Sequence, residues 1–444
     1  LKTFTDLWWI RRACTLCAEC SGGLVRRCPR VIVSRVTSSY RASQRTMELP
    51  RLLPGDILDS VYDLRCGRQV LNKDRFFTLP TTPPPLLYTM GSFNSAPKIM
   101  NEDTQDNDLD LPEDLSKDEL LVYCRKELED TPALVPRKFK TLQNCEAPSI
   151  YDKEVSQPQL KLRILQWNLL SQALGQNNDN FVCCPDGALD WRRRKHQMAE
   201  EIIKYDPDVI CLQEVDHFHY LKRILATQGF QGTFFPKPDS PCMYIKGNNG
   251  PDGCAIFYRQ DKYELLKTET RVLEVWRVQS NQVAVLVILR DKTSNQEICV
   301  ATTHLKARNG ALLSTLRNEQ GKDLLEFVNT HSDGRPVILS GDFNAEPIEP
   351  IYNTVLSHDL LKLRSAYCNN AGEPPYTTWK VREEGEVKHT IDYIFFSQNN
   401  FKVDSILEFP TGEEIGEGRI PSFSYPSDHF SLVCDLSLIE TSNS

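Results

Sequence analysis

Apolar and polar residues follow one pattern up to about residue 160 and another beyond it. Beyond that point, short runs rich in β-branched residues alternate with segments in which apolar residues recur every three to four positions. This alternation is typical of strands interleaved with amphipathic helices. It continues to about residue 440 without a repeat of fixed period. We therefore predict one α/β domain over residues 160–440, a size that suits a fold with two packed sheets.

Individual elements of this domain are predicted from apolar runs and capping residues. Asp190 is a suitable N-cap for a helix through Lys204, because Met198, Ile202 and Ile203 would form one buried stripe. Continuous apolar runs of strand length predict six strands. They cover residues 162–167, 208–212, 298–302, 336–339, 389–396 and 430–434.

The first 159 residues differ in composition. Residues 1–47 hold nine Lys or Arg against two acids, a net charge of +7, which predicts a mitochondrial leader or a basic tail. Residues 48–115 are Pro-rich and then acidic, which is typical of a linker, and a product starting at Met90 would match the N-myristoylation pattern, which often occurs by chance. Residues 116–159 are predicted to form a short helix, capped by Ser116 with Glu119, and a connector.

Charge and cysteine content exclude some classes of protein. The net charge of −8 for the whole chain leaves −15 outside the first 47 residues, which argues against a protein that binds nucleic acid merely by being basic. No apolar run approaches the ~20 residues of a membrane span. Fifteen cysteines, an odd number spread over 444 residues, indicate reduced thiols rather than a disulfide framework.

Polar side chains stand at one end of nearly every predicted strand. Asp, Glu and His are rarely buried without partners, because their desolvation costs several kcal/mol, of order 2–7 for even an uncharged polar group. Such residues from separate strands therefore indicate one polar pocket at a sheet edge. The candidate site residues are Asn168, Glu214, His304, Asp342, Asn344, Asp392, Asp428 and His429.

The composition of this set narrows its chemistry. It contains no Ser or Cys in an activating context and no Cys/His spacing of a zinc site. Carboxylates with Asn favour a hard cation such as Mg²⁺, and such an ion beside His and Asn donors suits the hydrolysis of phosphate esters. Basic residues suited to an anionic substrate occur at Lys237, Lys306, Arg308, Lys380 and Arg382.

Seven short motifs occur in order along the chain: Trp167-Asn168, Leu212-Gln213-Glu214, Asp252-Gly253, Thr303-His304, Gly341-Asp342-Phe343-Asn344, Ile391-Asp392-Tyr393 and Ser427-Asp428-His429. This ordered set resembles the endonuclease/exonuclease/phosphatase superfamily, in particular its branch of poly(A)-specific deadenylases. Among the closest stretches are residues 212–217, 250–255, 303–308 and 374–380. The resemblance runs from about residue 116 to the end, and it implies a four-layer α/β/β/α fold with two sheets flanked by helices.

The resemblance also implies a role for each site residue. Mg²⁺, with Mn²⁺ as a substitute, would be held by Glu214 with Asn168 beside it. Asp342 would orient or activate the attacking water. His429, paired with Asp392, would stabilise the pentavalent phosphorus. The remaining positions are Asn344, which would position substrate or water, and His304 and Asp428, which would complete the site.

Two substrates are implied for such a site. One is NADP(H), from which removal of the 2′-phosphate would give NAD⁺ and NADH, and the other is poly(A), shortened from its 3′ end. Because the domain is acidic overall and its few relevant basic residues cluster close to the chemistry, we favour the compact dinucleotide over a long RNA strand. The expected substrate-binding residues are Lys237, Lys306, Arg308, Asn344 and Arg382.

A third interpretation is a non-catalytic adaptor in messenger-RNA regulatory complexes. The complete set of site positions argues against this as the only role. The resemblance further implies a mitochondrial or cytoplasmic enzyme with circadian or metabolic regulation. We expect a monomer without a transmembrane segment.

Overall fold

The computed structural model describes residues 115–142, 160–177 and 181–439. The basic leader, the linker and the Met90 pattern predicted within the first 114 residues lie outside these ranges, as does the rest of the connector after residue 142. No helix in the described part of the chain combines the length and the apolarity needed to cross a membrane. The cysteines within these ranges are free thiols, and Cys211, Cys299 and Cys434 are buried in strands as small apolar side chains.

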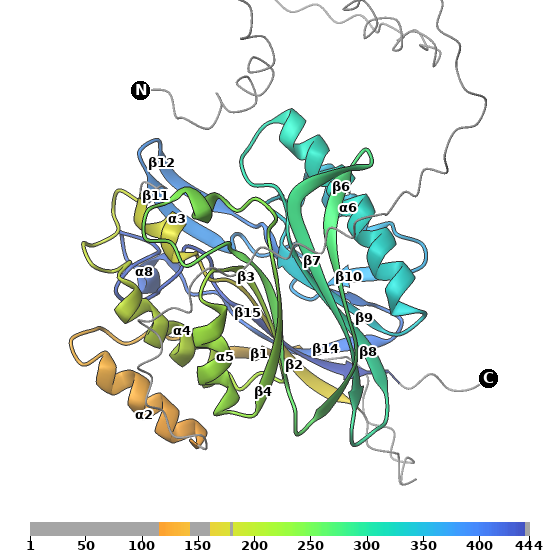
Figure 1. Ribbon diagram of the computed structural model, residues 1–444, viewed down its shortest axis with the longest axis horizontal. Helices are drawn as coiled ribbons and strands as arrows, with labels where there is room; N and C mark the ends of the chain where they lie inside the picture. The colour runs from red at the N-terminus through yellow and green to blue at the C-terminus, as the bar shows by residue number, and fades with distance from the viewer. Residues whose placement is uncertain (1–114, 143–159, 178–180, 440–444) are drawn as a thin grey trace, which may run out of the picture. The chain divides into compact units, whose positions relative to one another are not determined.

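Two sheets pack face to face at the centre of the domain (Figure 1). The first has seven strands in the order β1-β14-β15-β2-β3-β5-β4, and the second has six in the order β10-β13-β9-β8-β7-β6. The strands of the first sheet are β1 (Phe139–Thr141), β2 (Lys161–Asn168), β3 (Val209–Val215), β4 (Phe230–Pro236), β5 (Gly253–Arg259), β14 (Phe401–Leu407) and β15 (Leu432–Leu438). Those of the second are β6 (Tyr263–Val275), β7 (Val278–Asp291), β8 (Glu297–His304), β9 (Val337–Asp342), β10 (Leu363–Ser365) and β13 (Asp392–Ser397).

Helices cover the outer face of each sheet, which confirms the four-layer α/β/β/α arrangement (Figure 1). On the first sheet lie α2 (Lys117–Glu127), α4 (Trp191–Lys204) and α5 (Phe218–Ala226), and on the second lie α6 (Ala311–Ser332) and α7 (Pro350–Leu356). Shorter elements border the sheets. They are α3 (Gln172–Asn177), η2 (Pro241–Tyr244), α8 (Gly412–Ile415) and the hairpin of β11 (Thr378–Arg382) with β12 (Gly385–His389).

Three apolar layers hold these elements together. The inner layer lies between the sheets and includes Ile164 of β2, Val209 of β3 and Val285 of β7. One outer layer joins the first sheet to α4 and α5, and the other joins the second sheet to α6. Strands β2, β3, β8 and β9 are therefore covered on both faces, which explains why their sequences read as continuous apolar runs.

The domain extends further toward the N-terminus than residue 160. Helix α2 has the predicted capping box of Ser116 and Glu119, and its Leu120 and Cys124 are buried in the same apolar layer as α4. Strand β1 pairs with β14 at the edge of the first sheet. Residues 115–142 are thus part of the folded domain rather than a separate helix and connector.

Candidate active site

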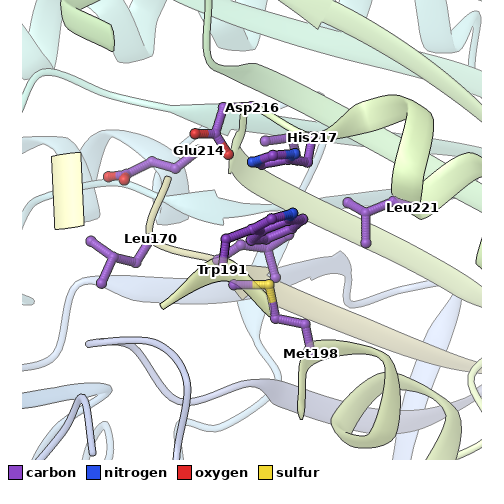
Figure 2. Close-up of a pocket in the computed structure, with 9 residues that line it drawn as sticks. Leu170, Trp191, Met198, Glu214, Asp216, His217 and Leu221 are labelled. Atoms are coloured by element: carbon purple, nitrogen blue, oxygen red, sulfur yellow. The ribbon is translucent and has the colours of Figure 1, made fainter. Parts of the chain in front are cut away.

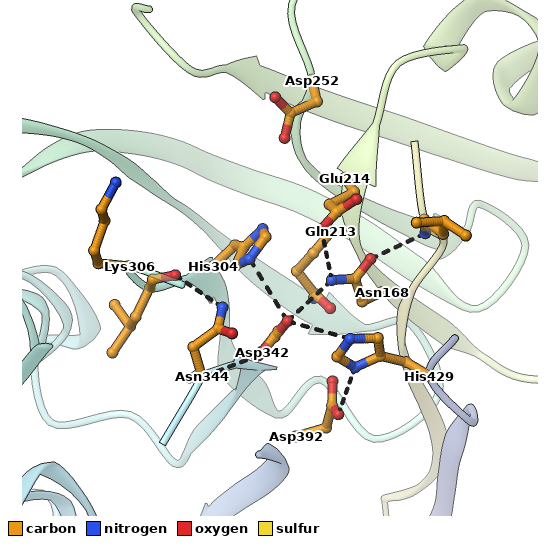
Figure 3. A network of polar contacts seen from close by, with 12 residues as sticks. Asn168, Gln213, Glu214, Asp252, His304, Lys306, Asp342, Asn344, Asp392 and His429 are labelled. Carbon is orange, nitrogen blue, oxygen red and sulfur yellow. Dashed lines mark hydrogen bonds and ion pairs between the residues drawn. The ribbon is translucent and has the colours of Figure 1, made fainter. Parts of the chain in front are cut away.

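Strand register gathers the predicted polar residues at one edge of the two sheets (Figure 3). In the second sheet, Asp342 lies between His304 of β8 and Asp392 of β13 as its direct cross-strand neighbours. In the first sheet, Asn168 pairs with Gln213 at the ends of the parallel strands β2 and β3. The next residue, Glu214, has φ +53° at a register shift in β3, and this bulge turns its side chain toward the site.

Asp342 is the centre of the network. Its Oδ2 accepts a hydrogen bond from Asn168 Nδ2 at 2.9 Å, across the two sheets, and its Oδ1 accepts one from the Asn344 amide at 2.8 Å. The Nε2 atoms of His304 and His429 lie 3.5 and 3.8 Å from Oδ2. Burial and the charge of Asp392 raise the pKa of Asp342 to about 6. This carboxylate can therefore accept a proton near neutral pH.

His429 and Asp392 form a buried pair below Asp342. His429 Nδ1 lies 2.8 Å from Asp392 Oδ2, and Asp392 also accepts hydrogen bonds from Thr377 Oγ1 at 2.6 Å and Gln166 Nε2 at 3.1 Å. Burial alone would lower the pKa of His429, but the surrounding carboxylates, first that of Asp392, raise it to about 10. The imidazole is therefore a cation at neutral pH, suited to stabilising negative charge on a phosphoryl group.

Asp428 is anchored by the hairpin of β11 and β12. Its Oδ2 pairs with Nζ of Lys380, and both side chains are buried. Although burial disfavours the charged carboxylate, Lys380 and His429 hold the pKa of Asp428 well below its usual range, and Arg382 contributes to this. The Arg382 guanidinium lies 4.9 Å from the ring centre of Phe181. Lys380 thus fixes Asp428, and Arg382 lies close to the same carboxylate.

Lys237 lies inside the site rather than on its surface. Its Nζ is 2.6 Å from Asp252 Oδ2 and 3.3 Å from His304 Nδ1. A Lys ammonium only donates, so His304 Nδ1 accepts and its proton lies on Nε2, the nitrogen that faces Asp342. Burial, followed by the charge of Lys237, holds the pKa of His304 well below its usual value. We predicted that Lys237 binds substrate; the contacts in the structure are those of a residue that orients His304.

Lys306 and Arg308 follow β8 on an exposed loop. The buried Arg317 of α6 holds this loop, because its Nη1 donates to the carbonyls of Lys306 at 3.0 Å and Arg308 at 2.7 Å. Its Nη2 in turn contacts Glu349 at 2.7 Å. Asn344 Nδ2 donates to the Leu305 carbonyl at 3.0 Å, so the same loop is joined to the residues after β9.

Glu214 fits the donor set of a hard divalent cation, because its half-buried carboxylate offers two oxygen atoms. Asn168 beside it is buried, and in this structure its Nδ2 faces Glu214 while its Oδ1 accepts from the Leu170 amide. Glu214 Oε1 lies 3.2 Å from Asn168 Nδ2, and its Oε2 accepts from the Ser171 amide at 3.0 Å. Ligand atoms of Asp342, Asp392 and His429 also lie within 4.8 Å of one another. In that second group the carboxylate of Asp392 already accepts three side-chain hydrogen bonds and His429 is a cation, so we favour the Glu214 position.

A small cavity lies beside Glu214 (Figure 2). Apolar side chains such as Met198 and Leu221 line it, and Trp191 stacks on His217 with ring centres 3.6 Å apart. Its free space holds about one water molecule, far less than pockets of about 300–1,000 Å³ that enclose small ligands. We therefore place the substrate at the polar edge and not in this cavity.

Several residues that support the site were not predicted as site residues. Gln166 and Thr377 hold Asp392, and Ser427 Oγ donates to the Asn168 carbonyl at 2.7 Å. Arg194 of α4 contacts the loops on both sides of the site. Thr377 and Ser427 lie within stretches that carried the family resemblance, whereas no local signal distinguishes Gln166 or Arg194 from ordinary strand and helix residues.

Fold and site together define a class of protein. The profile of the endonuclease/exonuclease/phosphatase family matches residues 165–429, and the chain belongs to this family of metal-dependent phosphoesterases.

Within the family, the chain is a member of the nocturnin group. It is 52% identical over 396 residues to nocturnin of Drosophila melanogaster, with 80% of this chain and 61% of that protein covered. It is 45% identical over 338 residues to human nocturnin, with 74% of this chain and 76% of that protein covered. The solved catalytic domain of human nocturnin with a bound sulfate anion matches with a TM-score of 0.56 at 40% identity, covering 68% of this chain and 98% of that one. The chain thus spans about three-fifths of the length of its Drosophila relative.

Proposed function

We propose that this phosphoesterase removes the 2′-phosphate of NADP⁺ and NADPH, and that it uses Mg²⁺. The observation that carries the proposal is the position of the basic residues. Lys306 and Arg308 lie on the loop after His304, and the charge of Arg382 acts on Asp428, so cations influence the reacting groups from two different elements. This arrangement suits a compact, multiply charged dinucleotide in a chain that is otherwise acidic.

Each side chain of the site has its own role in the hydrolysis of the phosphate ester. The oxygen of water forms a bond to phosphorus, the bond from phosphorus to the ribose 2′ oxygen breaks, and the leaving oxygen takes up a proton. Asp342 accepts the proton of the attacking water, and the His429 cation, held by Asp392, stabilises the phosphoryl oxygens. His304 presents its Nε2 proton to the same region. The divalent cation at Glu214 and Asn168 would neutralise charge on the phosphoryl group.

Removal of nucleotides from poly(A) is the second candidate function. It uses the same phosphoester chemistry, and Tyr244 of η2 exposes 72% of its surface, a face on which a base can stack. Ser240 and Cys242, which precede Tyr244, contact Asp252 at the border of the site. A non-catalytic adaptor is the third candidate.

A side-by-side assay of the purified full chain on NADPH and on oligo(A) distinguishes the three. Glu214→Ala serves as the blank. We expect Mg²⁺-dependent release of phosphate from NADPH. Shortened oligo(A) without phosphate release would favour the deadenylase, and neither activity in a protein with a normal circular dichroism spectrum would favour the adaptor.

A second experiment tests the basic loop. Lys306→Gln and Arg308→Gln are expected to raise KM for NADPH more than they lower kcat, because the loop binds the phosphates without taking part in bond breaking. Lys322→Gln, on α6 and paired with Glu319, is the matched control for loss of a surface charge. A normal KM in both loop variants would remove Lys306 and Arg308 from the binding site.

A further inference from the structure

Arg194 on α4 is fully buried and binds only backbone carbonyls through its hydrogen bonds. Its Nε donates to the Pro426 carbonyl at 2.7 Å, and its Nη2 donates to the carbonyls of Leu169, at 2.6 Å, and Leu170. Among the residues that the structure describes, the third nitrogen, Nη1, has no hydrogen-bond partner. The nearby carboxylates of Glu214, Asp216 and Asp428 interact with Arg194 through charge alone.

These three carbonyls belong to the two loops that carry the site. Leu169 and Leu170 follow Asn168 at the end of β2, and Pro426 precedes Ser427, Asp428 and His429. The loops also contact each other directly. Ser427 Oγ donates to the Asn168 carbonyl at 2.7 Å and accepts from the His429 amide at 3.1 Å. Arg194 therefore joins the two loops from its position on α4.

The first loop sets the orientation of the residues expected to hold the metal. Leu170 has φ +59°, a left-handed conformation that a Leu adopts only when its surroundings hold it there. Its amide donates to Asn168 Oδ1 at 3.0 Å, which directs the Asn168 Nδ2 toward Glu214 and Asp342. The next amide, that of Ser171, donates to Glu214 Oε2. The carbonyl of Leu170 is one of those that Arg194 binds.

We propose that Arg194 is a positioning residue of the phosphoesterase site, which holds the Asn168 loop and the Ser427–His429 loop at a fixed separation. A planar guanidinium with donors in a rigid fork can bind three carbonyls from two loops, which the single ammonium of Lys cannot do with the same geometry. A buried charge without a directly bonded carboxylate is costly to desolvate, and this cost offsets part of what its hydrogen bonds to the three carbonyls contribute to stability. A role in positioning the two loops therefore explains a guanidinium at this place better than a contribution to the stability of the fold does.

The test uses the full chain with Arg194→Met, Arg194→Lys and a matched control, Arg163→Met. Arg163 also binds a backbone carbonyl and a carboxylate, those of Tyr205 and Asp435, but at the other end of α4 and β2. Two quantities are measured on each folded variant: kcat on the substrate that the parent hydrolyses, and the Kd for Mn²⁺ in the absence of substrate. Thermal unfolding reports stability separately.

We expect Arg194→Met to lower kcat and to weaken Mn²⁺ binding by about 10–100-fold each, as removal of a residue that orients metal ligands does. Arg194→Lys should recover part of both, and Arg163→Met should lower only the melting temperature. A folded Arg194→Met with the kcat and Kd of the parent overturns the proposal. If Arg194→Met does not fold, a folded Arg194→Lys with unchanged kcat and Kd does so.

The proposal depends on the phosphoesterase class and not on the choice of substrate. If the parent hydrolyses neither NADPH nor oligo(A), the proposed function fails. The Mn²⁺ affinities of the Arg194 and Arg163 variants then decide the role of Arg194 alone.

Discussion

Asp392→Asn changes one charge at the centre of the site and keeps the shape of the side chain. In the parent, Asp392 Oδ2 lies 2.8 Å from His429 Nδ1 with both groups buried, and this carboxylate is the first of those that raise the pKa of His429 to about 10. The amide of Asn can still contact Thr377 and Gln166. The perturbation is therefore mainly electrostatic.

The expected shift of the pH–rate profile follows from how the substitution changes the pKa values of His429 and Asp342. His429 acts as a cation, so activity requires a pH below its pKa. Loss of a directly bonded carboxylate lowers that pKa by about 2 units, or about 2.7 kcal/mol, because burial, which disfavours the cation, remains. The pKa of Asp342, which burial and Asp392 raise to about 6, falls as well when the neighbouring negative charge is removed. Both limbs of the pH–rate profile should therefore move to lower pH.

The assay is kcat measured from about pH 5 to about pH 11, which extends about one unit beyond each limb of the parent profile. We expect the alkaline limb to move from near 10 to about 8, so that activity at pH 9 falls about tenfold relative to activity at pH 7. The pKa of His429 can be read independently from its ring NMR signals.

Asp435→Asn is the control, because Asp435 of β15 pairs with Arg163 away from the site. It should leave both limbs in place. A profile for Asp392→Asn that is uniformly lower, with both limbs where the parent has them, would refute the assignment of His429 as a cation held by Asp392.

Three further predictions concern other parts of the domain. Glu214→Gln should weaken Mg²⁺ binding, measured by calorimetry, by more than the roughly 10–100-fold expected for a residue that only orients a ligand. Arg137→Met leaves Glu201, its buried partner at 3.4 Å, without a cation and should lower the free energy of unfolding by about 3–5 kcal/mol in urea titrations. Gly341→Ala would place a Cβ 2.2 Å from the Thr303 carbonyl oxygen at φ +152°, and should cost about 3 kcal/mol and displace the strand end before Asp342.

Each of these has a contradicting result. Unchanged Mg²⁺ affinity in Glu214→Gln would move the metal to another donor set. Wild-type stability of Arg137→Met would show that its ion pair with Glu201 does not stabilise the fold, and Arg137→Met with Glu201→Gln should regain part of the loss. Gly187→Ala, at φ +79° with open space around it, is the control for Gly341 and should cost about 1 kcal/mol.

Features with a local cause were predictable from the sequence. Asp190 caps α4, with its carboxylate accepting from the Arg192 amide, because an N-cap depends only on its next few residues. The strands covered on both faces appeared as apolar runs, and polar residues at their ends marked the site. The strand pair β6 and β7 was not predicted as such, because β6 is half exposed and mixes polar and apolar residues without a clean period.

Only the tertiary structure shows which side chains of the site contact one another. The sequence identified Asn168 and Asp342 as candidates, but their 2.9 Å hydrogen bond joins strands of different sheets, 174 positions apart. Other contacts also join residues that are far apart in the sequence. They include the ion pair of Lys237, the carbonyls bound by Arg194 and the packing of α2 and β1 on the domain. Local propensity carries no information about such contacts, because they arise from strand register and from the packing of one sheet on the other. The residues of the site could therefore be predicted from the sequence, whereas their contacts and individual roles depend on the fold.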